Sequence, residues 1–391
     1  MNARHSLVIA VESPFVERDW QRFGVDDLAK RFEIQIIDVS PIAQPSLFKL
    51  RSRTLLTDPR ISVITDIDQL EILIESTNGG ALISNVGVGR IRRELFRLAR
   101  NRKLLIAEFE LGAMPDITKR QRSALSRVIQ RWRQMPSLWS VPDLVLKKIR
   151  RQSIGNDLPD VFYRGGLLAR GRHPRLGSEV VDVHSLDFEL AQAIDRTGLT
   201  SESRRLVYLD QNLGFHSDVP GLGLKHPVSP ETFYPLINSY FDWLQQEHGF
   251  HVVICPHPRA EISATRDRFP GKEISQVPTA LEVARSGAAC GHISTSFSYA
   301  VIFRRPTLVL TSSEISRSWY APYIDSFVEE LAAPLVDLSL RESWQPPAPT
   351  INANQESSYA HYQVNYLNSS PTQTRKLWEI VGDDILERIS D

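Results

Sequence analysis

Short apolar runs alternate with helical stretches along the first half of the chain. The runs are rich in β-branched residues, as are strands that a parallel sheet buries on both faces. The stretches between them carry apolar residues at helical spacing, as in 91–99. This alternation predicts an α/β fold with a doubly wound parallel sheet. The expected strands cover residues 6–11, 33–39, 62–67, 81–87 and 103–110.

A second series of the same kind begins at residue 204. Between the two series, residues 156–177 are rich in Gly, Pro and Arg and indicate irregular structure. The chain loosens again after Pro334, and a last helix is expected over 372–389. In the second series we expect strands over 204–210, 251–257, 288–293 and 307–311, and helices over 230–248 and near 279–285.

The repetition predicts two Rossmann-like domains that face a cleft. A chain of 391 residues suits two domains of roughly 150–200 residues each. We expect the first domain over 1–200 and the second over 201–371. The terminal helix, within 372–391, is expected to cross back and pack on the first domain.

Charge and cysteine content exclude several classes of protein. Lys and Arg number 46, as do Asp and Glu, so the formal net charge is zero, which argues against a nucleic-acid binder. Two cysteines, Cys255 and Cys290, are too few for a disulfide scaffold or a four-cysteine zinc site. No apolar stretch approaches the ~18 residues of a spanning helix, and the run Leu7–Val11 is too short for a signal peptide. We therefore expect a cytoplasmic protein without a bound metal or cofactor.

The stretch 119–151 has a different composition. It holds ten basic residues against one acid, Asp143, and its apolar residues, Trp132 among them, recur at helical spacing. A basic amphipathic helix with tryptophans suits the interface of an anionic membrane. The alternative is a surface helix with a solvated basic face. The first interpretation predicts peripheral contact with the inner face of the cytoplasmic membrane.

Polar side chains follow three strands of the second series. Asp210 ends the first, His257, Pro258 and Arg259 follow the next, and Ser294, Thr295 and Ser296 follow the third. Ligands of doubly wound sheets bind outside the carboxyl ends of the strands, so these groups would share one site. An imidazole and a guanidinium can bind a phosphate, hydroxyls before a helix can add donors, and a carboxylate can act as a general base. His292 stands beside the hydroxyls and supports the same interpretation.

Each of these groups also has a structural interpretation. Asp210 can make an Asx-turn, and Asp218 on the same loop is the rival carboxylate. The hydroxyl run can be a simple helix cap. Thr279 and Glu282, three residues apart before an apolar run, indicate a capping box and no site. The glycine pair in 87–89 lacks the third glycine of a dinucleotide fingerprint, so a tight turn is the safer interpretation.

Asp210, His257–Pro258 and Ser294–Ser296, in this order, resemble the motifs of bacterial GT-B glycosyltransferases that use CMP-activated ulosonic acids. These are the sialyltransferases and the 3-deoxy-octulosonic acid (Kdo) transferases, with an acidic motif, an HP motif and an SS/ST motif. The resemblance covers about 204–313, a stretch that also looks like uncharacterised proteins of surface-polysaccharide gene clusters (lipopolysaccharide or capsule). The acidic motif departs from the family in reading Leu-Asp-Gln where the family has a doubled acid followed by Gly.

The resemblance implies a metal-independent transfer from a CMP-sugar to a glycan or lipid-linked glycan. His257 would hold the CMP phosphate together with Pro258, Arg259 and the Ser294–Ser296 hydroxyls. Asp210 would deprotonate the acceptor or, in a retaining enzyme, act as the nucleophile. The acceptor would bind to the first domain, whose strand ends offer Glu12, Ser84, Asn85 and Glu108.

Two alternatives remain open at this stage. One is a GT-B relative of the epimerase type that acts on a UDP-sugar. The other is a non-catalytic protein of polysaccharide assembly that kept the fold and lost the chemistry. Binding of CMP, of UDP or of neither nucleotide distinguishes the three.

Overall fold

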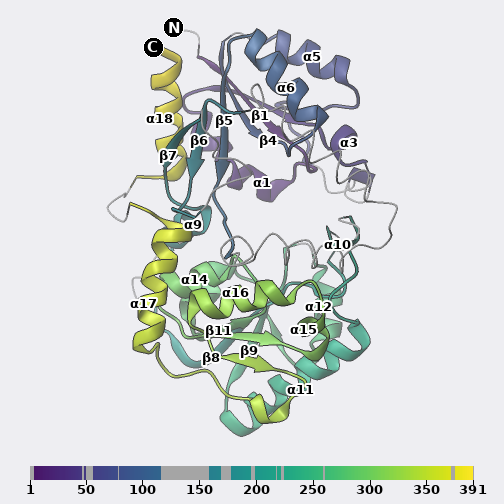
Figure 1. Cartoon of the computed structure of the whole chain (residues 1–391), viewed down its shortest axis with the longest axis vertical. Coiled ribbons are helices and arrows are strands. Elements are labelled where there is room, and N and C mark those ends of the chain that lie inside the picture. Colours follow the sequence, from purple (N-terminus) through teal and green to yellow (C-terminus); the bar gives the residue numbers. More distant parts are fainter. Residues whose placement is uncertain are drawn as a thin grey trace, which may run out of the picture. The chain divides into compact units, whose positions relative to one another are not determined.

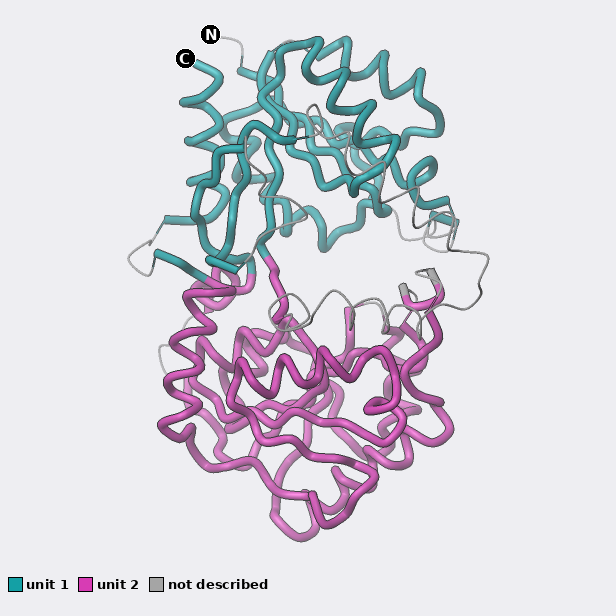
Figure 2. The backbone as a smooth tube through the Cα atoms, viewed as in Figure 1, with its two compact units in different colours: residues 1–111, 141–186, 368–391 teal, residues 112–140, 187–367 magenta. Residues whose placement is uncertain are grey.

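The chain forms two compact units (Figure 2). Each unit is built on one parallel sheet. Unit 1 comprises the described residues of 1–111, 141–186 and 368–391, and unit 2 those of 112–140 and 187–367. The basic stretch 119–151 lies outside the described residues. The computed structural model describes residues 4–45, 48–49, 56–77, 79–115, 158–168, 178–194, 199–216, 218–221, 224–258, 260–370 and 375–390.

Unit 1 contains a seven-stranded sheet of order β3-β2-β1-β4-β5-β6-β7 in which every pair is parallel. The strands are β1 (Ser6–Val11), β2 (Glu33–Asp38), β3 (Ile61–Val63), β4 (Gly80–Asn85), β5 (Leu105–Glu110), β6 (Val161–Arg164) and β7 (Glu179–Asp182). The helices are α1 (Glu17–Arg22), α2 (Val25–Leu28), α3 (Ser40–Ala43), α5 (Ile67–Glu75), α6 (Arg90–Asn101) and α18 (Leu377–Ser390).

Alternate residues of β1 divide the core of unit 1 into two layers. Leu7, Ile9 and Val11 face a layer that includes α2 and α18, whereas Val8 and Ala10 face the layer of α5 and α6. This is the period of two that a strand covered on both faces requires. Both layers consist of buried side chains, so the sheet is covered on each side (Figure 1).

The last helix, α18, supplies part of the first layer, as the sequence predicts. Its Trp378 packs against the backbone of Gly24, which has a positive φ of 56° and leaves no room for a Cβ atom. Polar contacts hold the helix at three points: Arg31 Nε to Asp383, Tyr163 Oη to Asp384, and Arg388 to Glu179, each 2.7 Å long. The last helix therefore covers part of one face of the unit 1 sheet.

Unit 2 contains a six-stranded parallel sheet of order β10-β9-β8-β11-β12-β13. Its strands are β8 (Glu202–Leu209), β9 (His251–Cys255), β10 (Glu273–Ile274), β11 (Ser286–Gly291), β12 (Thr307–Thr311) and β13 (Leu335–Asp337). Its helices are α9 (Leu186–Gln192, beginning in unit 1), α10 (Asp218–Gly221), α11 (Pro230–His248), α12 (Ile262–Arg268), α13 (Thr279–Arg285), α14 (Phe297–Ile302), α15 (Ser313–Arg317), α16 (Ala321–Leu331) and α17 (Ala353–Tyr362). A 3₁₀ turn (Arg341–Ser343) and a π turn (Gln363–Leu367) complete the unit.

Two sequence-based expectations about irregular regions were wrong. Residues 161–164 form β6, an inner strand that is hydrogen-bonded on both sides, although the stretch 156–177 indicated irregular structure. After Pro334, β13 and α17 form where the chain was expected to loosen. These strands have only four and three residues, so their pairing with neighbours and not a sequence period stabilises them.

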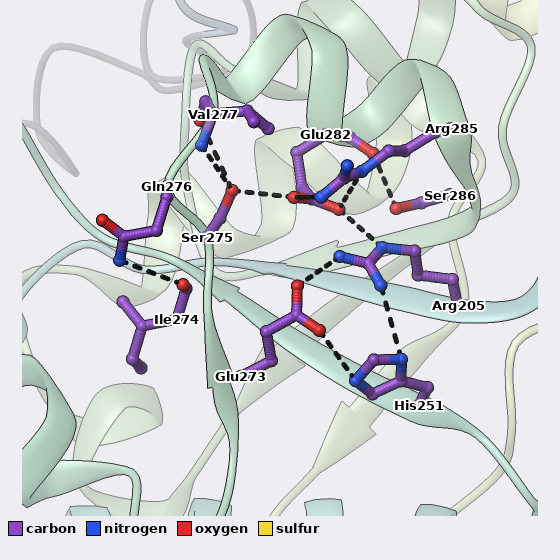
Figure 3. A network of polar contacts seen from close by, with 10 residues as sticks. All are labelled: Arg205, His251, Glu273, Ile274, Ser275, Gln276, Val277, Glu282, Arg285 and Ser286. Carbon is purple, nitrogen blue, oxygen red and sulfur yellow. Dashed lines mark hydrogen bonds and ion pairs between the residues drawn. The ribbon is translucent and has the colours of Figure 1, made fainter. Parts of the chain in front are cut away.

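A buried ionic network crosses the sheet of unit 2 (Figure 3). Arg205 donates from Nε to Glu282 at 2.7 Å and from Nη2 to Glu273 at 2.6 Å. Arg285 and Ser275 also donate to the Glu282 carboxylate, at 2.6 and 2.7 Å. Glu282 is therefore not the capping-box residue that its spacing from Thr279 indicates, because its side chain points to the sheet and Pro278 stands at the helix cap.

The network explains how a fully buried carboxylate stays ionised. Burial opposes ionisation of Glu282, but hydrogen bonds from Arg285, Arg205 and Ser275 outweigh it and lower the pKa to about 2. The folded pKa lies below the unfolded value, so the stabilisation is complete above about pH 4.5 and is lost as the pH falls towards 2.

We expect Glu282→Gln to destabilise unit 2 by about 3–5 kcal/mol at pH 7, because it removes the buried charge that pairs with Arg205 Nε and with Arg285 and leaves Arg205 only its pair with the exposed Glu273. The loss should shrink below pH 4.5. Urea unfolding of both chains across this pH range measures it. Glu356→Gln, which removes an exposed ion pair with Arg304, is the matched control and should cost no more than about 1 kcal/mol. Equal losses for the two variants would contradict the analysis.

Candidate active site

The polar groups predicted at three strand ends lie at one edge of the unit 2 sheet. β8 lies between β9 and β11, and Leu209 is in register with Cys255 on one side and Gly291 on the other. Asp210 continues the ladder by donating its N–H to the Cys255 carbonyl at 3.0 Å. The segments that begin at Asp210, Pro256 and His292 thus leave the sheet side by side. The strand order reverses between β8 and β11, which is where α/β sheets bind ligands.

Asp210 is 5% exposed, and its two carboxylate oxygens differ in environment. Oδ1 accepts the N–H of Asn212 at 2.9 Å, as the Asx-turn alternative predicts. Oδ2 is buried and accepts no hydrogen bond from any residue that the structure describes. Burial raises the pKa of Asp210 to about 6, against the lowering effects of the Asn212 amide, the Arg268 guanidinium and the backbone amides of His257 and Gln211. The result is a carboxylate with one oxygen fixed and one oxygen able to take a proton.

Gln211 joins the Asp210 loop to the loop that follows β11. Its side-chain Oε1 accepts the N–H of Ile293 at 2.8 Å and the hydroxyl of Tyr320 at 2.7 Å. Tyr320 precedes α16 and is 6% exposed, so the second bond anchors the junction in the core. This brace fixes the separation of Asp210 from the hydroxyl run of residues 294–296.

His257 lies half-buried at the end of β9, and Pro258 beside it is exposed. The His257 ring packs edge-on against the ring of His216, with centroids 4.7 Å apart. His216 belongs to the loop after Asp210, so two imidazoles from neighbouring loops meet at this edge. Arg259 lies outside the described residues.

Ser294, Thr295 and Ser296 follow β11 and are half-buried. Ser294 Oγ accepts the N–H of Ser296 at 3.1 Å, so one hydroxyl caps the turn, as the structural interpretation of the run expects. Thr295 and Ser296 make no side-chain hydrogen bond to a described residue. A hydroxyl that accepts can also donate, so all three remain able to donate to a ligand.

His292 was wrongly grouped with the hydroxyls. It is fully buried, with Nδ1 2.8 Å from the Leu310 carbonyl and Nε2 3.2 Å from the Tyr208 hydroxyl. Burial lowers the pKa of His292 to about 4, so this imidazole is neutral at pH 7. The alternation of a strand explains the error, because the residue after Gly291 points to the core and not to the edge.

Sequence reasoning missed the residues that shape the Asp210 loop. Asn212 has a left-handed backbone with φ of 52°, and its side-chain oxygen is bonded by Arg268 of α12. The same guanidinium lies 4.4 Å from the Phe215 ring centroid. These contacts stiffen the loop that carries His216. Their partners lie more than fifty residues apart in the chain, and no local pattern announces them.

The corresponding edge of unit 1 holds the residues predicted to contact an acceptor. A cavity of about 180 Å³ there is lined by Ser84, Asn85 and Glu108, among others. Glu12 instead accepts the N–H of Gly87 at 2.7 Å and so fixes the turn after β4.

Of the described residues, no group of three or more His, Cys, Asp or Glu could hold a metal ion. No helix among the residues that the structure describes is long and apolar enough to cross a membrane.

The raised pKa of Asp210 predicts that this carboxylate lowers stability. Its folded pKa of about 6 exceeds the ordinary 3.8, so stability falls as the pH rises from about 4 to 6. Since one pKa unit corresponds to about 1.4 kcal/mol, Asp210→Asn should stabilise unit 2 by up to about 3 kcal/mol at pH 8 and by little at pH 4. Asn keeps the oxygen that accepts from Asn212. Thermal unfolding at both pH values measures the effect, with exposed Asp325→Asn as control. Destabilisation at pH 8 would instead give the carboxylate a structural role.

No protein-family model matches the sequence, and no curated protein matches it. Solved structures do match. A variant of the wall teichoic acid polymerase TagF has a TM-score of 0.57 at 10% identity, over 100% of this chain and 90% of its own. The same polymerase after a soak with CDPG has a TM-score of 0.56 at 11% identity, with the same coverage. UGT2 of Phytolacca americana, complexed with UDP-2fluoro-glucose and pterostilbene, has a TM-score of 0.49 at 12% identity, over 99% of this chain and 100% of its own.

The likeness to TagF runs through the whole chain and concerns the fold. Each unit has the strand order of a Rossmann-like sheet, and the last helix of the chain packs on the first unit. The chain therefore has an α/β fold of the GT-B type, as the sequence predicts.

Proposed function

We propose that the chain is a glycosyltransferase that transfers a sugar from a CMP-sugar to a cell-surface glycan. The sugar proposed is a ulosonic acid such as Kdo or a sialic-type acid. One observation carries the proposal: Asp210, His257 and the hydroxyls of 294–296 follow three adjacent strands of unit 2, at the edge where the strand order reverses. An α/β sheet binds its ligand at this place, and the GT-B fold of the chain supports a nucleotide-sugar as that ligand.

The donor phosphate is assigned to His257 and to the hydroxyls of Ser294, Thr295 and Ser296, with Pro258 and Arg259 alongside. Breaking the bond between the sugar and CMP leaves the electron pair and the negative charge on the phosphate. Fixed hydrogen-bond donors stabilise such charge without moving during the reaction. The Gln211 brace to Ile293 holds the hydroxyls in place, and the packing of His216 holds the His257 ring.

Asp210 is assigned as the general base. Its Oδ2 takes the proton of the acceptor hydroxyl while the acceptor oxygen bonds to the anomeric carbon and CMP departs. A base with a pKa near 6 is ionised at pH 7 and remains a better proton acceptor than an ordinary carboxylate. This proposal needs neither a metal ion nor a cofactor.

The acceptor is assigned to the strand-end edge of unit 1, with Asn85 and Glu108 in contact and Glu12 fixing the turn. Its chemistry is a glycan or a lipid-linked glycan. The basic stretch 119–151 suits contact with an anionic membrane surface, so we place the enzyme in the cytoplasm, peripheral to the inner face of the membrane.

Binding of CMP tests the donor site. We expect CMP, more than UDP, to raise the melting temperature of the full chain. His257→Ala should weaken CMP binding by about 10- to 150-fold, which corresponds to the 1.5–3 kcal/mol of a hydrogen bond to a charged group. Calorimetry measures this, with exposed His361→Ala as the matched control. Stronger stabilisation by UDP favours an epimerase-type enzyme, and no effect of either nucleotide favours an assembly protein.

Turnover tests the base. General-base assistance contributes about 10²–10⁴-fold, so Asp210→Asn should lower kcat by about that factor and leave CMP affinity nearly unchanged. In the parent chain kcat should fall below about pH 6, as Asp210 takes up a proton, and the residual rate of the variant should lack this limb. Asp218→Asn, at the start of α10, is the comparison. If it abolishes transfer while Asp210→Asn stays active, the base is misassigned, and full activity of both removes the carboxylate mechanism.

A further inference from the structure

Helix α6 of unit 1 begins with an unusual concentration of positive charge. Its first turn holds Arg90, Arg92 and Arg93 and no acidic residue, and the cap residue Gly89 offers no side chain to the free amide groups. The N-terminus of a helix already carries the positive end of the helix dipole, which acidic side chains normally compensate. The positive charge in the first turn of α6 would therefore destabilise an isolated helix.

Arg92 is the residue of this turn that points inward. It is 2% exposed, and its guanidinium lies 4.4 Å from the ring centroid of Phe96. Nε donates to Glu108 Oε1 at 2.8 Å, which balances the charge. Nη2 is buried as well, yet it donates to no residue that the structure describes. A buried guanidinium nitrogen without an acceptor is costly, and each such group in a native structure calls for an explanation.

The cavity at the carboxyl edge of β4 and β5 explains the unused donor. Arg92 lines it together with Ser84 and Asn85, which can add a hydroxyl and an amide. The other charged groups of the lining are Glu108, which Arg92 itself engages, Glu110 and the exposed Arg22. The space of about 180 Å³ accommodates a small polar group. All of these residues belong to unit 1.

We propose that Arg92 binds an oxyanion, a phosphate or a carboxylate group of a ligand, in the cavity at the start of α6. Nη2 supplies the charged hydrogen bond, and the Ser84 hydroxyl and the Asn85 amide, which line the same cavity, add neutral donors. Glu108 fixes the guanidinium through Nε and leaves its outer edge to the ligand. The inference rests on the proposed function only in making this ligand the acceptor, which would then carry an acidic group. It adds Arg92 as a residue that selects acidic over neutral acceptors.

Calorimetric titration with inorganic phosphate and with acetate tests the site. The chain used carries His257→Ala, so that the proposed donor site contributes little. We expect phosphate, acetate or both to bind, and the added pair Arg92→Gln/Glu108→Gln to weaken that binding at least tenfold. Changing both residues leaves no unpaired buried charge, and circular dichroism checks that the variant folds. The matched control is Arg97→Gln, on the exposed side of the same helix and paired with Glu94.

The stronger of the two anions identifies the acidic group. The proposal is overturned if neither anion binds. It is also overturned if the Arg92→Gln/Glu108→Gln variant weakens anion binding no more than Arg97→Gln does. CMP affinity of the chain with His257 intact is measured in parallel. Unchanged CMP binding together with a negative anion result rejects only the role of Arg92. If the chain with His257 intact does not bind CMP but the anion still binds as expected, only the proposed donor site is rejected.

Discussion

Every function considered above depends on one constraint, the common direction of the strands. In both sheets each named strand runs parallel to its neighbours, so all carboxyl ends lie at the same edge. Helices must then return the chain to the opposite edge, and the loops between strand and helix collect where the strands end. Where the strand order reverses, the neighbouring loops turn to opposite faces and open a crevice. Asp210 in unit 2 and Ser84 in unit 1 owe their positions to this rule.

Asp210 and Glu282 show that burial alone does not decide the charge state of a carboxylate. Both are almost inaccessible to water, yet the pKa is about 6 for Asp210 and about 2 for Glu282. Glu282 lies among two guanidinium groups and a hydroxyl, whereas Asp210 receives backbone amides and a more distant arginine. Strong pairing makes Glu282 part of the scaffold. Weak pairing leaves Asp210 at a cost in stability, which is the usual signature of a residue kept for chemistry.

The sequence predicted the long strands, the two-sheet organisation, the returning helix and the three polar groups at strand ends, because each leaves a local pattern of burial. Short strands such as β6 were not predicted, since four residues are too few to show the alternation of apolar and polar positions. The contact of Arg268 with Asn212 and the buried, unpaired Nη2 of Arg92 were not predicted either. Both depend on residues brought together only by the fold. The capping-box prediction for Glu282 was wrong for the same reason. Its spacing from Thr279 fits a helix cap, but its partner Arg205 lies 77 residues away in the chain.

The return of α18 to unit 1 has a consequence for how the chain folds during synthesis. The described residues of unit 2 from 187 to 367 are complete before α18 leaves the ribosome, so this unit can close early. Unit 1 emerges first but lacks Leu377, Trp378, Val381 and Ile385, which cover one face of its sheet, until α18 has been synthesised. The half of the molecule that is made first is thus the last to be sealed, and its exposed apolar face is what chaperones of the nascent chain would meet.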